Sequence, residues 1–259
     1  SVIQQISNTS QVIITTHNGS FVNRGNISSN IIIDNGIGRK ANNIQEIREL
    51  LGIKLSDNLI SSETVVIVEG SDDAISLEYI FSKLSAKVKN AINNKKIAFT
   101  DMGGATNLKY KCALYASMMC KYFVIVDADK CGISSYEEAK QKGLVEEKNS
   151  AILYAYGDNK ESEFEDFLKK DFYKDLIYND YGVDLEVKEF KGCKYKWSDR
   201  LKKSFNAQSK PFGDKTEAEI KEKIADMIVK TDSLNDILPD CYLEKLKYVC
   251  AQIERILDV

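Results

Sequence analysis

Residues 65–73 read VVIVEGSDD, and residues 122–129 read YFVIVDAD. Both stretches are short apolar runs that end abruptly in carboxylates, as is typical of buried parallel strands that carry acidic side chains to the rim of a sheet. Asp127 in the second stretch follows Glu69 in the first by 58 residues. Carboxylates gathered at such a rim are the ligands that magnesium chemistry needs. The two stretches therefore predict a parallel sheet with a metal site at its edge.

The chain around these stretches alternates between predicted strands and predicted helices. The strands are expected at 64–69, 96–101, 122–127 and 150–156, and the helices at about 72–85, 106–120 and 135–142. Such alternation predicts an α/β fold in which helices cover both faces of a parallel sheet. Open sheets of this kind bind ligands beyond the carboxyl ends of their strands. Four acids fall at such ends, namely Glu69, Asp101, Asp127 and Asp129.

The segments on either side of this alternation have other patterns. Upstream, residues 11–17 have the pattern of a buried strand, residues 30–34 form a second β-rich run, and residues 52–63 read as a connector. Directly after the fourth predicted strand, residues 161–168 start another helix, which would bring one more acid to the same rim. Beyond about residue 171 the chain is predicted to be mostly helical. The strongest helical patterns lie at 216–230 and 240–257.

Composition narrows the class of protein. A chain of 259 residues with 43% hydrophobic residues can bury a core, and its net charge of −3 creates no global field that attracts nucleic acid. The six cysteines include no CxxC pair and there is a single histidine, so no Cys/His zinc site is expected. No apolar run approaches the roughly 20 residues that span a bilayer, and the N-terminus lacks a signal-peptide pattern. We expect a cytoplasmic protein with reduced thiols and no membrane partner.

Acidic residues at the ends of strands have two interpretations. Two or three carboxylates that converge there repel one another unless a cation lies between them, and Mg²⁺ accepts carboxylate oxygens while it retains water. Alternatively, each acid only caps the helix that follows its strand, an interpretation that suits Asp72 and Asp73. For any single acid the capping interpretation is favoured. The combination of a Glu-Gly pair after one strand with a later Asp-x-Asp after another favours the metal.

Two motifs carry a resemblance to a known family. Val-Glu-Gly-x-x-Asp at 68–73 and Val-Asp-Ala-Asp at 126–129 resemble the two motifs of a Toprim domain, the metal-binding catalytic module of topoisomerases, primases and certain nucleases. The resemblance implies a Toprim (Rossmann-like) parallel sheet flanked by helices. It also implies that Glu69 is a metal ligand or an acid/base group, and that Asp127 and Asp129 hold magnesium.

A narrower resemblance comes from the N-terminal residues. Residues 11–18, QVIITTHN, resemble the final strand and switch histidine of an ABC-type ATPase, in which the histidine, here His17, contacts the γ-phosphate of ATP. An ATPase tail that runs directly into a Toprim domain is the layout of the OLD (overcoming lysogenization defect) family of nucleases, which includes Gabija-type anti-phage proteins. In that family a second-metal acid follows the fourth strand, which points to Glu165, with Glu163 close behind. Asp73 stands where the family often carries an acid four residues after the first glutamate, and so gains a metal role besides capping.

The chain also departs from that family. It contains no GxxxxGK[ST] phosphate loop, so the nucleotide-binding half of an ATPase is missing. Either the chain is the C-terminal part of a longer protein or a separate chain supplies that half, and ATP is a ligand only if that half is present. We expect an ATPase remnant and connector at 1–61, a Toprim domain at 62–170 and a mostly helical C-terminal extension at 171–259. Without its partner, a lone histidine at a strand end is usually a structural or solvated residue.

A segment rich in lysine and aromatic residues lies between Glu186 and Lys210. Basic side chains bind phosphates without sequence preference and exposed aromatic rings stack on unpaired bases, so this segment is a candidate DNA-binding surface. The candidate contacts are Lys194, Lys196, Arg200, Lys202 and Lys203. The alternative is a solvated helix face with Trp197 in the core, and the sequence does not decide between them. Lys210, in Ser-Lys-Pro, resembles a lysine that the OLD family uses near the scissile phosphate.

Together these features predict a metal-dependent endonuclease that nicks or cuts DNA. One or two Mg²⁺ or Mn²⁺ ions would activate water and stabilise the leaving oxygen, while Lys210 neutralises charge on the phosphate. The expected ligands are Glu69, Asp73, Asp127, Asp129 and Glu165. The expected partners are DNA, the ATPase half, further copies of the chain, and a helicase-like or defence protein.

Three alternatives stay open. A topoisomerase would need a tyrosine nucleophile, a primase would need an additional polymerising apparatus, and a catalytically degenerate Toprim would serve only in assembly or DNA binding.

Overall fold

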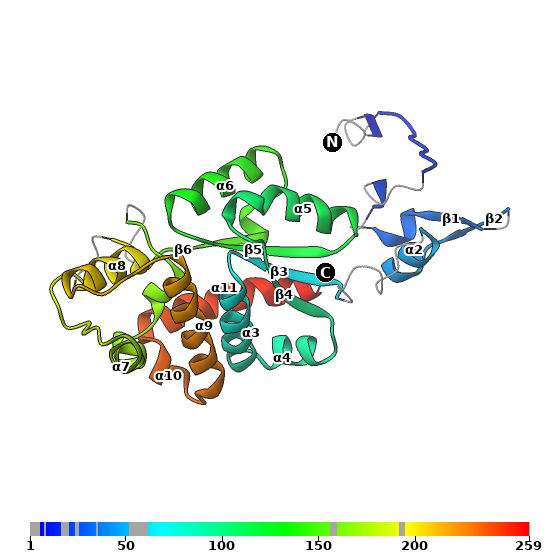
Figure 1. Cartoon of the computed structure of the whole chain (residues 1–259). Coiled ribbons are helices and arrows are strands. Elements are labelled where there is room, and N and C mark those ends of the chain that lie inside the picture. The colour runs from blue at the N-terminus through cyan, green and yellow to red at the C-terminus, as the bar shows by residue number, and fades with distance from the viewer. Residues whose placement is uncertain are drawn as a thin grey trace.

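A four-stranded parallel sheet forms the centre of the computed structural model, which describes residues 6–7, 9–16, 21–23, 26–34, 36–51, 62–155, 160–191 and 195–258 (Figure 1). Its strands are β3 (Thr64–Val68), β4 (Ile97–Asp101), β5 (Lys121–Asp127) and β6 (Ser150–Leu153), in the order β4-β3-β5-β6. The central strand β3 is buried over its whole length. Val68 pairs with Asp101, and Asp127 pairs with Leu153, so the strands end together at one edge. The predicted parallel sheet is confirmed.

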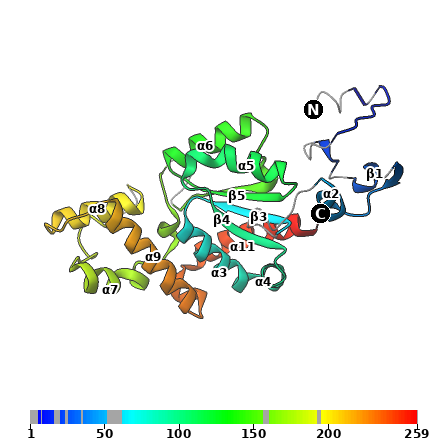
Figure 2. The ribbon, with the colours of Figure 1, turned by 45° about the vertical axis from the view of Figure 1, so that its right-hand side comes forward.

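Helices cover both faces of the sheet, as the alternation predicts. One face carries α3 (Ser71–Leu84), α4 (Ala86–Asn93) and α11 (Asp240–Asp258), and the other carries α5 (Leu108–Ser117) and α6 (Lys130–Gln141) (Figures 1 and 2). Successive side chains of a strand point to opposite faces, so Val66 joins a hydrophobic cluster with Phe81 whereas Val65 joins one with Tyr115. The sheet is therefore buried between two apolar layers, which explains why its strands read as continuous hydrophobic runs.

Several element boundaries differ from the expected ones, each for a local reason. α6 begins at Lys130 rather than near residue 135, because the Asp129 side chain accepts the backbone N–H of Gly132 and starts the helix there. β6 ends at Leu153 rather than at residue 156. At this end of the strand, the Ser162 hydroxyl donates a hydrogen bond to the Leu153 carbonyl. The helix expected from residue 161 is only a 3-10 turn, η6 (Phe164–Phe167).

The C-terminal part of the chain is helical, as predicted. Its helices are α7 (Lys170–Tyr181), α8 (Trp197–Ala207), α9 (Asp214–Lys230), α10 (Leu234–Ile237) and α11. α7, α8 and α9 lie beyond the carboxyl ends of the strands, and α11 returns along the sheet (Figures 1 and 2). Ile224 of α9 and Ile253 of α11 belong to the same cluster as Phe81, so the extension and the sheet share a continuous core. None of the described helices combines the length and the apolar character needed to cross a bilayer.

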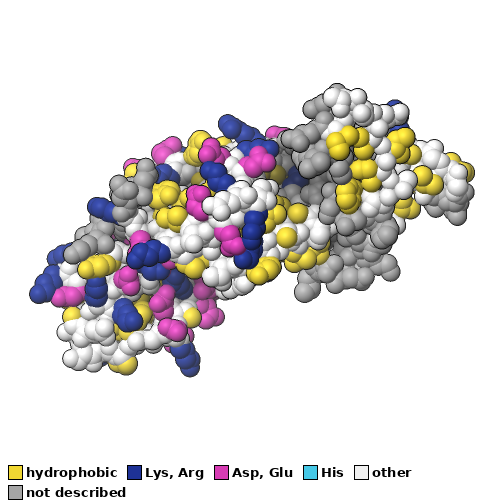
Figure 3. Space-filling view, turned by 90° about the horizontal axis from the view of Figure 1, so that it is seen from above, with side chains coloured by type: hydrophobic (Ala, Val, Ile, Leu, Met, Phe, Trp, Pro, Cys, Tyr) yellow, Lys and Arg dark blue, Asp and Glu magenta, His cyan; other side chains and the backbone are white. Residues whose placement is uncertain are grey.

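The N-terminal residues form a small structure at the end of the molecule opposite to α7 and α8 (Figure 1). It comprises η2 (Ile27–Ser29), an antiparallel hairpin of β1 (Ile31–Asp34) and β2 (Ile37–Lys40), and α2 (Ile44–Leu50). The β-rich run at 30–34 is therefore confirmed. The strand expected at 11–17 is wrong for residues 11–16, which have no regular secondary structure and leave Ile13 79% exposed. Hydrophobic side chains gather over this end of the molecule in Figure 3. His17 lies outside the described residues.

Candidate metal centre

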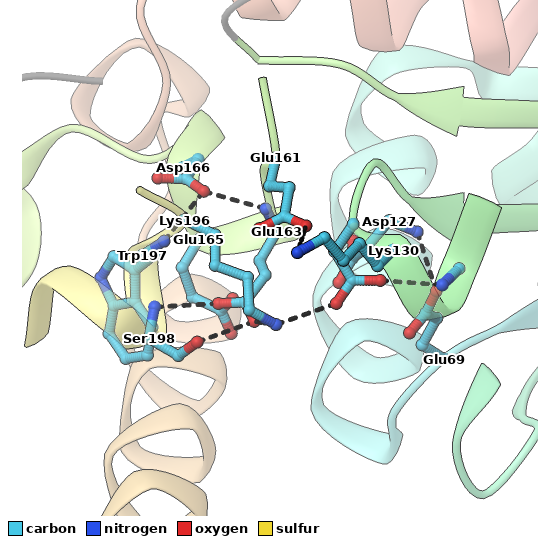
Figure 4. Close-up of polar contacts among 12 residues, drawn as sticks. Glu69, Asp127, Lys130, Glu161, Glu163, Glu165, Asp166, Lys196, Trp197 and Ser198 are labelled. Atoms are coloured by element: carbon cyan, nitrogen blue, oxygen red, sulfur yellow. Dashed lines mark hydrogen bonds and ion pairs between the residues drawn. The ribbon is translucent and has the colours of Figure 1, made fainter. Parts of the chain in front are cut away.

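The two strands that end in acids lie side by side, so their acids meet. Glu69 directly follows β3, and Asp127 is the last residue of the neighbouring strand β5. Glu69 Oε1 accepts a hydrogen bond from the backbone N–H of Asp127 over 3.0 Å (Figure 4). Glu69 is half-buried and Asp127 is buried. The two motifs that the sequence singles out are thus joined directly.

Asp73 reaches the same edge from the first turn of α3. Its Oδ2 accepts the backbone N–H of Gly70 over 2.9 Å, which fixes the turn between β3 and the helix. The capping role expected for Asp73 is therefore present. Because the turn carries Glu69 as well, the hydrogen bond also sets the position of that carboxylate relative to Asp73.

Asp129 and Gly132 shape the turn after β5. Asp129 Oδ1 accepts the Gly132 N–H over 2.8 Å as the N-cap of α6, and Asp129 Oδ2 accepts a hydrogen bond from Lys196 Nζ over 2.8 Å. The turn approaches the site very closely: a β-carbon at residue 132 would lie 2.4 Å from the Asp127 carbonyl oxygen and 2.6 Å from Glu69 Oε1. Only glycine therefore fits at residue 132 without displacing Glu69 or the end of β5.

The segment after β6 supplies two carboxylates that are fully engaged by α8. Glu163 accepts hydrogen bonds from the Ser198 N–H and hydroxyl, each over 2.9 Å, and pairs with Lys196 Nζ at 2.7 Å (Figure 4). Asp166 accepts the backbone N–H groups of Glu163 and Trp197 over 2.9 and 3.1 Å and forms an ion pair with Arg200. Glu163 is a predicted metal ligand, but in this structure its oxygens hold α8 against the segment.

Glu165 differs from both of these acids. It is only 3% exposed, and its Oε2 has no hydrogen-bond partner among the described residues. Lys221 Nζ of α9 lies 3.4 Å from that oxygen, close enough for an ion pair. The same ammonium group lies 5.7 Å from the centroid of the Trp197 ring. Glu165, predicted from the resemblance as a ligand of a second metal, therefore has a buried oxygen that Lys221 approaches but that accepts no hydrogen bond from the described residues.

The carboxyls at the ends of the two strands and Glu165 share a raised pKa. Burial is the first cause in each case, and the charges of the neighbouring carboxylates add to it. The pKa of Glu69 rises to about 7, that of Asp73 to about 6 and that of Glu165 to about 8, while that of Asp127 is well above its usual range. Groups that resist ionisation together in this way are stabilised as carboxylates when a cation lies among them.

The pKa of Asp129 and that of Glu163 are lowered instead. Burial acts to raise both, but it is outweighed by the hydrogen bond from Gly132 and the contact with Lys196 at Asp129, and by the charges of Lys221 and Lys196 at Glu163. These two carboxylates therefore ionise readily without a metal. Their negative charge is matched by ammonium groups from the helical extension.

The residue types and the orphan oxygen of Glu165 fit a hard divalent cation such as Mg²⁺ or Mn²⁺. As the side chains stand, no three Asp, Glu, His or Cys residues of the described chain surround a common point closely enough to hold a metal ion. Within the described residues the six carboxyl groups lie near two ammonium groups, those of Lys196 and Lys221, so ionisation of all six would leave negative charge in excess.

The remaining predicted site residues are dispersed. Lys210 is exposed, and its Nζ lies beside Gly182 at the end of α7, 3.1 Å from where a β-carbon there would be. Within the described residues it makes no ion pair with a carboxylate of the centre, so its role near a scissile phosphate stays a prediction. Lys202 is exposed, and Lys203 lies over the Tyr195 ring. Lys194 lies outside the described residues.

The aromatic residues of the same segment are mostly core residues. Phe190, Trp197 and Phe205 are at most 2% exposed, which confirms the alternative in which Trp197 packs in the core. Arg200 is also buried, where it contacts Asp166 and donates to the Phe190 carbonyl over 3.1 Å. In this structure Arg200 is therefore closed off from DNA, whereas Lys196 contacts two carboxylates of the candidate centre and keeps 24% of its side chain exposed.

Sequence reasoning missed Lys221. A signal for it exists, since residues 221, 224 and 228 share one helical face and the latter two are buried isoleucines. A lysine at a position that this pattern would give to an apolar residue indicates a buried charge with a partner.

Comparison with known families agrees with the motifs of the sheet. Residues 61–129, from just before β3 to the cap of α6, match the family described as overcoming lysogenization defect protein-like, TOPRIM domain. The match includes Glu69, Asp73, Asp127 and Asp129, and it ends before the segment that carries Glu165. No curated protein and no solved structure matches the chain significantly.

Proposed function

We propose that this chain is a metal-dependent nuclease that hydrolyses phosphodiester bonds in DNA at the carboxyl ends of β3 and β5. The observation that carries the proposal is the hydrogen bond from the Asp127 backbone N–H to Glu69 Oε1, which joins two acids whose pKa values are both raised. Clustered acids of this kind are typical of functional sites, because a structural domain gains nothing from mutual repulsion. The match of residues 61–129 to an OLD-like TOPRIM domain supports a nuclease or DNA-processing role.

Some residues of the centre would bind the metal, and others would contact the phosphate. Bound Mg²⁺ or Mn²⁺ would supply a Lewis acid for the phosphate and a water of lowered pKa. Glu69, Asp73 and Asp127 would provide oxygen ligands, and Glu165 would provide a further one. Nearby carboxylates raise the pKa of Lys196 against the opposing effect of burial, so this ammonium stays protonated and can donate to phosphate oxygens as charge builds on them.

We extend the proposal to an OLD-type arrangement in which an ATPase half controls the centre, for example in anti-phage defence. The resemblance of residues 11–18 to the end of an ABC-type ATPase supports it. So does the exposure of Val12, Ile13 and Ile14, because consecutive apolar side chains on a surface suit burial against another part of such an ATPase.

Plasmid cleavage tests the proposed nuclease. Supercoiled DNA incubated with the chain should be nicked or cut in Mg²⁺ or Mn²⁺ and stay intact in EDTA. The Asp127→Asn variant should lose at least about 100-fold in rate, as expected when a charge that acts on the transition state is removed. Asp101→Asn is the matched control, since Asp101 ends the neighbouring strand β4. Cleavage at the wild-type rate by a folded Asp127→Asn protein would refute the proposal and favour an assembly or DNA-binding module.

A further inference from the structure

Lys221 enters the acidic centre from outside the sheet. It belongs to α9, which packs against α3, and its Nζ lies 3.4 Å from Glu165 Oε2. The lysine side chain is only 22% exposed and the Glu165 side chain only 3%. The contact thus places a positive charge beside the one buried carboxylate oxygen of the centre that lacks a hydrogen bond in the described part of the chain.

The two ammonium groups of the centre are held differently. Lys196 contacts Asp129 at 2.8 Å and Glu163 at 2.7 Å, so it bridges two carboxylates that are themselves fixed by backbone groups. Lys221 contacts Glu165 at a distance too long for a good hydrogen bond. Lys196 is therefore part of the framework, whereas Lys221 lies at longer distances from its carboxylate partners, 3.4 Å from Glu165 and 3.8 Å from Glu217.

Lys221 also has a second partner on its own helix. Its Nζ lies 3.8 Å from Oε1 of Glu217, one turn earlier on α9. Residues four apart on a helix face one another, so a rotation about the lysine stem can carry the ammonium from Glu165 toward Glu217 without moving the backbone. The Glu217 side chain is 30% exposed, which puts this second position nearer to solvent.

We propose that Lys221 is a resident cation of the metal centre: its ammonium group neutralises Glu165 in the metal-free protein and moves toward Glu217 when a divalent ion binds Glu165. A divalent ion and an ammonium group repel each other strongly in a site with little water, so both cannot share one buried carboxylate oxygen. Binding of an ion at Glu165 therefore includes the displacement of Lys221. The inference rests on the proposed metal centre. It adds that a divalent ion reaches Glu165 by taking the place of the Lys221 ammonium group.

Titration of Mn²⁺ into EDTA-treated protein, with calorimetry for affinity and electron paramagnetic resonance for stoichiometry, tests the exchange. The variants are Lys221→Met, which keeps the length of the side chain without its charge, and Lys221→Arg, which keeps the charge. Lys223→Met is the matched control. Lys223 lies on the same helix, but its Nζ pairs with Asp180 over 2.7 Å, and Asp180 is not part of the centre. Circular dichroism establishes that each variant is folded.

The wild type should bind one ion tightly and a second more weakly. Lys221→Met should tighten the weaker site by about tenfold or more, a coupling of the size common between linked sites. Lys221→Arg and Lys223→Met should leave it weak. If the weaker site of folded Lys221→Met keeps its wild-type Mn²⁺ affinity, or no longer binds Mn²⁺, the exchange is overturned while the metal centre itself stands. Absence of Mn²⁺ binding in both the wild type and Lys221→Met would overturn the metal centre itself, and the exchange with it.

Discussion

Two groups of carboxylates meet at the edge of the sheet, and they are held in different ways. The sheet-end group, Glu69, Asp73 and Asp127, comes from the two motifs, and its pKa values are raised by burial and by mutual repulsion. The loop group, Glu163 and Asp166, follows β6 and is saturated with hydrogen bonds and ion pairs from α8. Within the described residues the first group makes no ion pair with a lysine or arginine, while Glu163 pairs with Lys196 and Asp166 pairs with Arg200.

This difference separates the acids that we propose to bind a metal from the acids that hold the fold. A buried carboxylate that is already matched by lysine, arginine and backbone donors gains little from a metal. A buried carboxylate without such partners gains a great deal. Glu165 lies in the loop between the two residues of the loop group, yet its raised pKa and an oxygen that accepts no hydrogen bond from the described residues make it resemble the sheet-end group.

The largest expected effect concerns the loop group. Asp166→Asn should destabilise the protein by about 3–5 kcal/mol, because it leaves the buried Arg200 guanidinium without a matching charge. Denaturant unfolding in EDTA measures this cost. Where the variant is folded, its affinity for Mn²⁺ should stay close to that of the wild type. A stable Asp166→Asn protein that no longer binds Mn²⁺ would break the comparison, since Asp166 would then belong with the metal ligands.

The next effect is a dependence of stability on pH to which the sheet-end group and Glu165 contribute. Their pKa values in the folded protein are raised, so the folded state binds more protons than the unfolded chain, and stability falls as pH rises from about 4.5 through 7 or 8. For Glu69 alone the loss is at most about 3 kcal/mol. Asp129 and Glu163, with lowered pKa values, act only below this window.

In thermal melts in EDTA, the midpoint temperature should therefore decrease as the pH is raised from mildly acidic to mildly alkaline. The decrease should be about 2–4 °C for each kcal/mol of stability lost. Mn²⁺ should remove most of this slope, because it binds the ionised carboxylates. The Asp127→Asn variant should show a shallower slope in EDTA. A midpoint that rises over the same pH range would contradict the charge distribution described for the sheet-end group.

A smaller effect is expected from the turn that lies against the sheet-end group. Gly132→Ala places a methyl group within 2.6 Å of Glu69 Oε1, so it should cost about 1–3 kcal/mol in stability and weaken Mn²⁺ binding by displacing Glu69. Gly143→Ala is the comparison, because no atom lies within 4 Å of a β-carbon there and any cost comes only from its positive φ of 67°. Unchanged Mn²⁺ affinity in Gly132→Ala would mean that Glu69 is not a ligand.

The sheet-end group could be predicted from the sequence, and the reason is local. Apolar runs that end in Glu69 and Asp127 specify both the strand and its end, and parallel pairing then brings neighbouring ends together. Asp73 follows from the helix that must start after the first strand. The cap that Asp129 provides is not predicted, because the helix is expected to start near residue 135, although an aspartate is a favoured N-cap residue.

The loop group and its cations could not be predicted in this way. Lys196 and Arg200 read as surface bases, because the pattern of α8 does not reveal that its first turn packs against the segment after β6. Lys221 reaches Glu165 only through the packing of α9 on α3, a contact between residues far apart in the sequence. The sequence context that singles out Lys210 is only Ser209 and Pro211, and such a short context carries no information about distance to the acids.

The most direct test of the central claim is the position of the metal. In a crystal soaked with Mn²⁺, the anomalous difference map should show its strongest peak bordered by Glu69, Asp73 and Asp127, with any weaker peak beside Glu165. Asp127→Asn crystals treated in the same way should lose the strongest peak. A strongest peak at Glu163 or Asp129, or a wild-type crystal with no peak at the ends of β3 and β5, would contradict the division of the carboxylates and the metal centre derived from it.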